Sequence, residues 1–222
     1  WKIQLPGLGS STPIIWEDRL FILTATPSEG EAQPPPPTGQ HSPSQQGKRR
    51  NRGRRPMTIL HGEQSFIVFA ISREDGSIIW QREANKTTPH EGKHPNNSFA
   101  SGSAITDGEH LIAFFGSWGL YCYDMDGNLQ WSRDLGDLNT RHGFGEGSTP
   151  ALSGNKVVVN WDHEGQSFIV ALNKKTGEEL WRRNRDEVTT WATPLVVRYE
   201  GRDQVITPGT NRVRSYDLES GD

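Results

Sequence analysis

The chain has 222 residues, 24 of them glycine and 14 proline, and only 32% are hydrophobic, which favours many short strands joined by turns over a helical bundle. Its formal net charge of −3 excludes a bulk electrostatic attraction to nucleic acid or to an anionic membrane. The single cysteine, Cys122, excludes an intrachain disulfide framework and a cysteine-rich metal site, and no apolar run reaches the roughly 18 residues of a transmembrane helix.

The first predicted strand, residues 20–23, is followed by a segment of a different composition. Residues 27–56 contain four consecutive prolines at 34–37 and six basic residues within 48–55, with almost no apolar side chains to offset the entropy of ordering. They predict a disordered Pro/Arg-rich insertion in the first repeat. One hypothesis is that the basic loop 48–55 binds an anionic polymer. A solvated loop without a specific partner is the favoured alternative, and no specific nucleic acid is expected because no aromatic residue is interleaved for base stacking.

Downstream of the insertion, the chain alternates between apolar stretches and glycine-containing turns. β-Branched and aromatic residues predict strands at 66–69, 111–114, 157–159, 168–170 and 195–197. Asp-Gly or Thr-Gly pairs at 75–76, 126–127 and 176–177 lie between paired stretches, where a tight turn needs a residue that tolerates positive φ. The pattern predicts a series of antiparallel hairpins.

A longer repeat organises these hairpins. Residues 70–80 and 171–181 each have alanine at the first position, glycine at the seventh and tryptophan at the eleventh. Residues 122–131 repeat the pattern one residue shorter, with Cys122 in place of the alanine, and residues 215–221 begin a fourth copy. The period of about 50 residues has room for four short strands. Because sheets with two apolar faces must stack, the predicted fold is all-β: a single partial β-propeller domain over 1–222, with about four blades of four-stranded antiparallel sheets.

These repeats resemble the pyrroloquinoline-quinone (PQQ) repeat family, whose blades carry an Ala-x-Asp-x-x-x-Gly-x-x-x-Trp motif. This sequence has Ser72 and Asn173 at the position of the motif's aspartate. The resemblance implies a fragment of a seven- or eight-bladed propeller in a periplasmic or otherwise extracytoplasmic location. It also implies that tryptophan docks each blade on the next, and it assigns this structural role to Ala70, Gly76, Trp80, Trp131, Ala171, Gly177 and Trp181.

The resemblance leaves two functions open. The favoured one is a non-catalytic propeller that acts as a scaffold for a protein partner or a small ligand. The alternative is part of a PQQ-dependent alcohol dehydrogenase, which would require PQQ and Ca²⁺. Dehydrogenases of this family commonly carry a disulfide between adjacent cysteines, which a chain with only Cys122 cannot form. We therefore assign no catalytic residue and no cofactor from the sequence.

Polar and ionisable residues gather in the segments that precede the Ser/Thr-Pro start of each repeat, and these segments are expected near one end of the propeller channel. We predict that they line a ligand pocket on one propeller face. The alternative interpretation is that they are turn and solvent residues. No metal site is predicted, because Pro89 and Pro95 prevent a helical pair of histidine ligands. The candidate ligand-binding residues are His90, His94, Arg141, His142, Glu146 and Trp191.

The polymer-binding hypothesis has a direct test. If the basic loop 48–55 binds anionic polymers, deletion of residues 45–55 abolishes salt-sensitive retention on a heparin column. Unchanged retention after the deletion would show that the loop does not bind such polymers.

Overall fold

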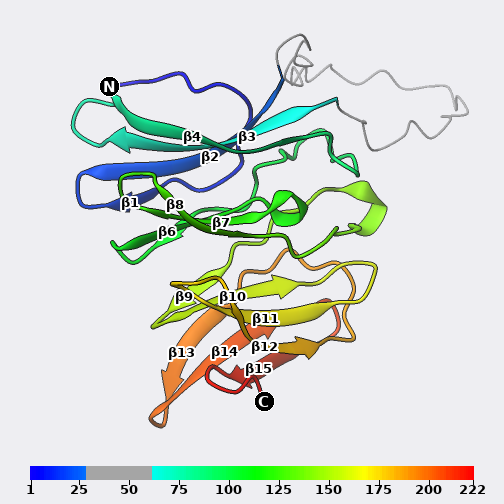
Figure 1. Ribbon diagram of the computed structural model, residues 1–222. Helices are drawn as coiled ribbons and strands as arrows, with labels where there is room; N and C mark the ends of the chain where they lie inside the picture. Colours follow the sequence, from blue (N-terminus) through cyan, green and yellow to red (C-terminus); the bar gives the residue numbers. More distant parts are fainter. Residues whose placement is uncertain (29–61) are drawn as a thin grey trace, which may run out of the picture.

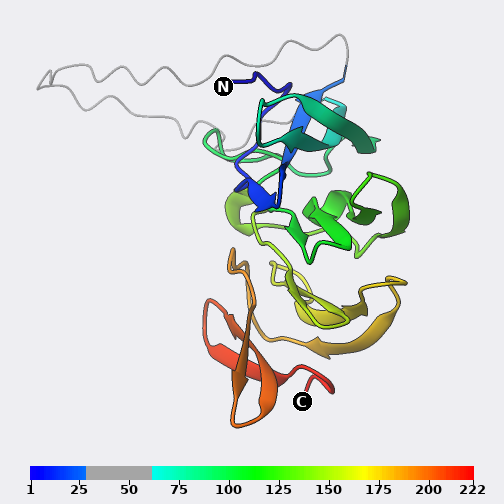
Figure 2. The same cartoon turned by 90° about the vertical axis from the view of Figure 1, so that its left-hand side faces the viewer.

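The computed structural model describes residues 1–28 and 62–222, which form antiparallel β-sheets almost throughout. Four sheets follow one another along the chain and are stacked from the N-terminal end to the C-terminal end (Figures 1 and 2). The predicted all-β architecture is confirmed. Within the described residues, no helix is long and apolar enough to cross a membrane.

In every sheet, strands that are neighbours in sequence are also neighbours in space. The first sheet contains β1 (Ile14–Trp16), β2 (Arg19–Pro27), β3 (Gln64–Ser72) and β4 (Ile78–Thr87). The second contains β5 (Ile105–Thr106), β6 (His110–Phe114), β7 (Leu120–Asp124) and β8 (Leu129–Arg133). The third contains β9 (Ala151–Ser153), β10 (Lys156–Trp161), β11 (Phe168–Asn173) and β12 (Glu179–Asn184). The fourth contains β13 (Leu195–Tyr199), β14 (Arg202–Pro208) and β15 (Val213–Asp217).

Two details differ from the sequence prediction. The fourth sheet has three strands in the described part of the chain, whereas four were predicted for each blade. The strand β2 extends to Pro27, the first residue assigned to the insertion, because Pro27 pairs with Gln64 at the end of β3. Residues 29–61, including the basic loop 48–55, lie outside the described residues.

Apolar side chains from both neighbours fill each interface between sheets. On β6, Leu111 and Ala113 pack against the first sheet, whereas Ile112 and Phe114 pack against the third. These four residues are 3% exposed or less. Successive residues of a strand point to opposite faces, so a strand that is buried on both faces needs an uninterrupted apolar run. This explains why the central strands appear in the sequence as continuous apolar stretches.

The repeated tryptophans occupy equivalent positions on the last strand of three sheets. In each case the tryptophan lies opposite a small residue of the neighbouring strand, and the register shifts directly after that residue. A small side chain leaves space beside the large indole ring. The opposing pairs are Ala70 with Trp80, Cys122 with Trp131 and Ala171 with Trp181.

Each indole also reaches the following sheet through a hydrogen bond. Its Nε1 donates to a main-chain carbonyl oxygen of that sheet, so the N–H groups of the largely buried Trp80, Trp131 and Trp181 have partners. The exposed Trp1 makes the same contact with the first sheet. The four donor and acceptor pairs are Trp1 to Arg73 O (2.9 Å), Trp80 to Met125 O (2.9 Å), Trp131 to Lys174 O (2.7 Å) and Trp181 to Leu218 O (3.0 Å).

The same rings pack against the turn glycine of the following sheet. A Cβ atom at any of these glycines would lie only 2.5–2.7 Å from an indole carbon. The glycines have φ between 70° and 80°, a left-handed conformation that side chains disfavour. Glycine is therefore required for two independent reasons, the backbone conformation and the close approach of the ring. The pairs are Trp1 with Gly76, Trp80 with Gly127, Trp131 with Gly177 and Trp181 with Gly221.

Two further contacts between sheets were missed in the sequence. An arginine lies two residues after each of Trp80, Trp131 and Trp181, and it donates to a main-chain carbonyl oxygen at or next to the glycine on which that ring lies. The pairs are Arg82 to Gly127 O, Arg133 to Gly177 O and Arg183 to Ser220 O, each at 2.7 Å. The Trp-x-Arg spacing was visible as a signal.

Beside the first strand of each of the first three sheets, a main-chain N–H donates to a hydroxyl oxygen of the next repeat: Thr12 to Ser103 (2.8 Å), Ser103 to Thr149 (2.9 Å) and Thr149 to Thr193 (3.4 Å).

The contact between indole and glycine can be separated from the backbone effect. Gly127 (φ 80°) lies against Trp80, whereas Gly201 (φ 79°) has no heavy atom within 4 Å of its Cβ position. We expect Gly127→Ala to lower the free energy of unfolding by roughly 2–4 kcal/mol, because strain and a steric clash add. Gly201→Ala should lower it by only about 1–2 kcal/mol. Urea unfolding measures both, and equal effects would contradict a role for the indole contact.

Candidate functional site

The six candidate site residues lie in three connections between sheets. His90 and His94 lie between β4 and β5, and Arg141, His142 and Glu146 lie between β8 and β9. Trp191 lies in the connection from β12 to β13. The connections touch one another, since His94 N donates to Phe144 O (3.2 Å) and Trp191 Nε1 donates to Gly145 O (2.7 Å). The fold thus brings segments of three successive repeats to one place.

Phe144 is the centre of an aromatic cluster, which we define as His94, His142, Phe144 and Trp191. The ring centroids of His94 and His142 each lie 5.4 Å from that of Phe144, and the indole of Trp191 is stacked on it at 6.5 Å. Trp191 remains 42% exposed despite this packing. Phe144 was not among the predicted residues. Its position between His142 and Glu146 was the only signal in the sequence.

The backbone at the edge of the cluster is unusual. His142 lies in the short 3₁₀ turn η2 (Arg141–Gly143) with φ of 58°, a left-handed value that is uncommon for a residue with a side chain. Such strain persists where the surroundings fix it, often at functional sites. The neighbouring Arg141 donates its main-chain N–H to Thr189 Oγ1 (2.8 Å), and its side chain is exposed. The turn therefore contributes the imidazole of His142 to the cluster and presents the guanidinium of Arg141 beside it.

His90 and Glu146 make different contacts, around Ser117 and Leu138. His90 Nε2 lies 2.8 Å from Leu138 O. The carboxylate of Glu146 accepts hydrogen bonds from Ser117 N (2.8 Å) and from Ser117 Oγ (2.6 Å), in the 3₁₀ turn η1 (Gly116–Trp118). A Cβ atom at Gly116 would lie 1.5 Å from Glu146 Oε2, so only glycine allows this approach. His90 thus joins the β4–β5 connection to the β8–β9 connection, whereas Glu146 holds the β6–β7 turn against the β8–β9 connection.

Burial dominates the electrostatics of Glu146. It raises the pKa of this carboxyl group to about 8, although the two hydrogen bonds from Ser117 favour the ionised form. The nearby charges of Glu91 and Asp137 raise the pKa further. At neutral pH, Glu146 is therefore largely protonated.

A small cavity lies beside Glu146, and Trp191 and Asn160 also line it. Its volume is about 20 Å³, which is space for a single water molecule. Asn160 is 3% exposed and donates from Nδ2 to Asp162 Oδ2 (3.0 Å), while its Oδ1 has no hydrogen-bond partner among the described residues. The cavity thus has room for one small hydrogen-bond donor.

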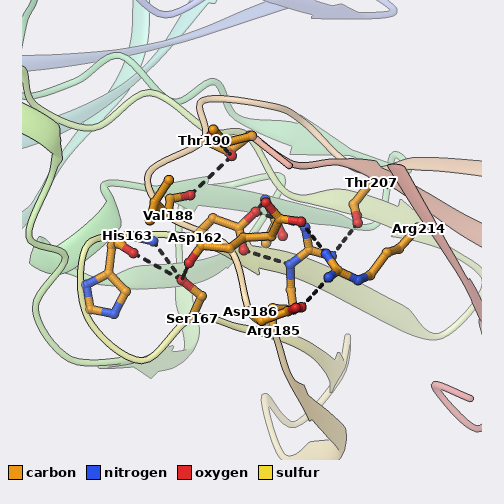
Figure 3. A network of polar contacts seen from close by, with 12 residues as sticks. Asp162, His163, Ser167, Arg185, Asp186, Val188, Thr190, Thr207 and Arg214 are labelled. Carbon is orange, nitrogen blue, oxygen red and sulfur yellow. Dashed lines mark hydrogen bonds and ion pairs between the residues drawn. The ribbon is translucent and has the colours of Figure 1, made fainter. Parts of the chain in front are cut away.

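A fully buried ion pair at the end of the third sheet lies next to this cavity, and its arginine is hydrogen-bonded to the fourth sheet (Figure 3). Arg185 Nε and Nη2 donate to the two oxygens of Asp162 at 2.7 and 2.9 Å, and both side chains are 0% exposed. Arg185 Nη1 also donates to Thr207 Oγ1 and to Tyr216 Oη, each at 2.7 Å. Burial opposes the guanidinium charge, but the contacts with Asp162 and Tyr216 outweigh it and raise the pKa of Arg185. This network could not be found in the sequence, because no fixed spacing links its members.

Carboxylates tie the neighbouring connections together as well. Glu91 accepts hydrogen bonds from the N–H and the hydroxyl group of Thr140. Glu164 accepts from the hydroxyl group of Thr189 at 2.8 Å. Carboxylates with such partners hold the loops in fixed positions. The aromatic cluster and Arg141 then remain as the features of these loops that are exposed to a ligand.

The comparison with known families agrees with this architecture. A family model described as outer membrane protein assembly factor BamB matches residues 64–222. This chain belongs to that family. No curated protein matches it.

Solved structures with a similar fold include a BamB protein and two alcohol dehydrogenases. BamB from Moraxella catarrhalis superimposes with a TM-score of 0.53 at 13% identity, covering 100% of this chain and 52% of its own length. Quinohemoprotein alcohol dehydrogenase ADHIIG from Pseudomonas putida HK5 gives 0.54 at 12% identity, with coverages of 100% and 34%. The quinohemoprotein alcohol dehydrogenase from Comamonas testosteroni gives 0.54 at 12%, with 98% and 34%. This BamB-family chain therefore spans about half of one relative and a third of the others, and these likenesses show the fold alone.

The described residues fit a quinone cofactor poorly. Cys122, which would have to belong to a disulfide packed on the ring system, is fully buried in β7, and burial raises the pKa of its thiol to about 12. The cavity of about 20 Å³ beside Glu146 is far below the roughly 300 Å³ at which ligand pockets begin. This part of the BamB-family chain therefore provides no cradle for PQQ beside the candidate residues.

One group of side chains has the spacing of metal ligands. Asp107, Glu109 and His110 each place one ligand atom within 4.8 Å of the others, in and after the turn between β5 and β6. Lys174 Nζ already lies 2.5 Å from Asp107 Oδ2 and 3.9 Å from Glu109 Oε2. The ammonium group supplies the positive charge that a metal ion would bring, so we assign no metal here.

The raised pKa of Glu146 gives a defined pH dependence of stability. The folded protein keeps this proton at pH values at which the unfolded chain has lost it, so the stabilisation is full below the usual pKa of 4.5 and is lost as the pH rises through about 8. At pH 7 the free energy of unfolding is therefore roughly 2–4 kcal/mol lower than it is below pH 4.5. We expect Glu146→Gln to gain stability relative to the wild type as the pH rises from 5 to 8, measured by urea unfolding. Glu74→Gln, at an exposed position, is the control, and parallel pH profiles for wild type and Glu146→Gln would refute the assignment.

Proposed function

We propose that this BamB-family chain is part of a non-catalytic, extracytoplasmic propeller that binds a protein partner through the aromatic cluster and Arg141. The family is described as an outer membrane protein assembly factor, and the proposed partner is a component of that assembly system. In this proposal, the contacts of Trp80, Trp131 and Trp181 are docking interactions that keep the loops of successive blades in register.

The exposed indole of Trp191 carries the proposal. It is stacked on Phe144 and anchored by its hydrogen bond to Gly145 O, yet 42% of it faces solvent. Fixed aromatic side chains lose little conformational entropy on binding, and tryptophan, tyrosine and arginine are enriched among the residues that dominate binding energy. A rigid indole beside the exposed Arg141 has this composition.

The alternatives have less support. Part of a PQQ-dependent dehydrogenase would need a pocket for the quinone, Ca²⁺ ligands and a catalytic base, and the small cavity beside Glu146 and the buried Cys122 do not supply them. Polymer binding through residues 48–55 concerns a segment outside the described residues.

A pair of matched aromatic variants tests the proposal in the full-length protein. We expect Trp191→Ala to reduce recovery of the assembly component at least about tenfold in quantitative affinity purification from the envelope, the effect of losing roughly 1.4 kcal/mol or more. Tyr199→Ala removes another exposed aromatic ring, 62% exposed at the end of β13, and should change recovery less than about twofold.

A photo-crosslinker at position 191 should label the same component, and one at position 199 should not. Unchanged recovery with Trp191→Ala, or equal losses for both variants, would overturn the proposal.

A further inference from the structure

Lys93 is a largely buried lysine for which the described residues supply no counter-charge. The residue is 6% exposed and lies in the connection from β4 to β5, one position before His94 of the aromatic cluster. Its Nζ is 5.6 Å from the ring centroid of Phe99. Within residues 1–28 and 62–222, Nζ has no hydrogen bond and no ion pair with another side chain. Burial lowers the pKa of this ammonium group, and no neighbouring acid counteracts the effect.

The other buried lysine and arginine of the described residues are paired. Lys174 is 8% exposed and contacts Asp107 at 2.5 Å, and Arg185 is 4% exposed and forms the bidentate pair with Asp162. Lysine is almost never fully buried unless it is paired, because desolvation of an ammonium group is costly. An aromatic ring compensates only part of that cost. Lys93 is therefore an exception to the way in which this fold treats buried charge.

The position of Lys93 connects it to the proposed binding face. A Cβ atom at Gly145 would lie 3.0 Å from Lys93 Cβ, and the carbonyl oxygen of Gly145 accepts the hydrogen bond from Trp191 Nε1. The base of the Lys93 side chain and the indole N–H of Trp191 thus lie against the same residue. An anion that reached Lys93 would lie close to an exposed aromatic surface.

We infer that Lys93 binds a carboxylate of the partner, supplied by an acidic side chain that lies next to an apolar residue packed on Trp191. This inference rests on the proposed function and names the chemistry of the partner segment. A single ammonium group is a point charge that balances the single charge of a carboxylate, whereas a phosphate dianion would leave an uncompensated negative charge in a largely buried position. The bound carboxylate would provide Lys93 with the counter-charge that the described residues do not supply.

The signals of the lysine side chains provide a direct test. In full-length protein labelled with ¹³C-lysine, the Cε–Hε signal of Lys93 is assigned by its loss in Lys93→Arg. We expect this signal to shift saturably with N-acetyl-glutamyl-phenylalanine amide, and at least about tenfold more weakly with the glutaminyl peptide, which lacks the charge. Acetate should give a weaker saturable shift, and inorganic phosphate should give none beyond that of sodium chloride at equal ionic strength. The exposed Lys175 should respond only to ionic strength.

A variant separates binding from structure. Lys93→Met should lose at least about tenfold in affinity for the glutamyl peptide while it keeps or gains thermal stability, because it removes an unpaired buried charge. Lys175→Met should change neither property. Unaltered peptide affinity in Lys93→Met, or a Lys93 signal that follows ionic strength alone, would overturn the inference.

The two proposals fail in different ways. If the crosslink at position 191 is retained but Lys93 gives no saturable response, only the inference about the carboxylate is wrong. If Lys93 responds to the glutamyl peptide but Trp191→Ala leaves partner recovery unchanged, Lys93 binds a carboxylate and the proposed binding face is wrong.

Discussion

Order between the sheets depends on a tryptophan ring that lies on a glycine of the next sheet. The ring can approach because the glycine has no Cβ atom, and the turn can form because glycine tolerates a left-handed φ. The indole N–H then donates to a carbonyl oxygen of the same sheet, as in the pair of Trp131 and Lys174. One side chain thereby combines apolar burial, a satisfied donor and a fixed distance between two sheets.

The position of the candidate site follows from this repeated docking. With the sheets held by indoles beside their last strands and by hydroxyl groups beside their first strands, the connections between them must run close to one another. Their carboxylates are used to join neighbouring loops, as Glu91 and Glu146 show. The exposed Trp191 and its surrounding rings are the surface that we propose for a partner. The same packing leaves Lys93 only 6% exposed, and no acid among the described residues pairs with it.

Much of the fold could be predicted because its determinants recur at fixed intervals. Trp80, Trp131 and Trp181 were visible as a repeat, and Arg82, Arg133 and Arg183 follow them at a constant spacing that was overlooked. His94, His142 and Trp191 of the aromatic cluster could be predicted from the sequence. Phe144 could not, because no repeated pattern in the sequence includes it. The pair of Asp162 and Arg185 could not be found, because its members are 23 residues apart and meet only when β10 and the segment after β12 are in place.

The sequence by itself determined the all-β class, the order of the hairpins and the residues that bind one sheet to the next. Strand periodicity and the needs of a left-handed turn act over a few residues, so they can be read from neighbouring positions. Only the tertiary structure decided which charged groups have partners. Asp162, Lys174 and Lys93 are similar in the sequence, as charged residues in a turn or loop. Whether each has an ion-pair partner depends on which distant segments of the chain lie within hydrogen-bonding distance.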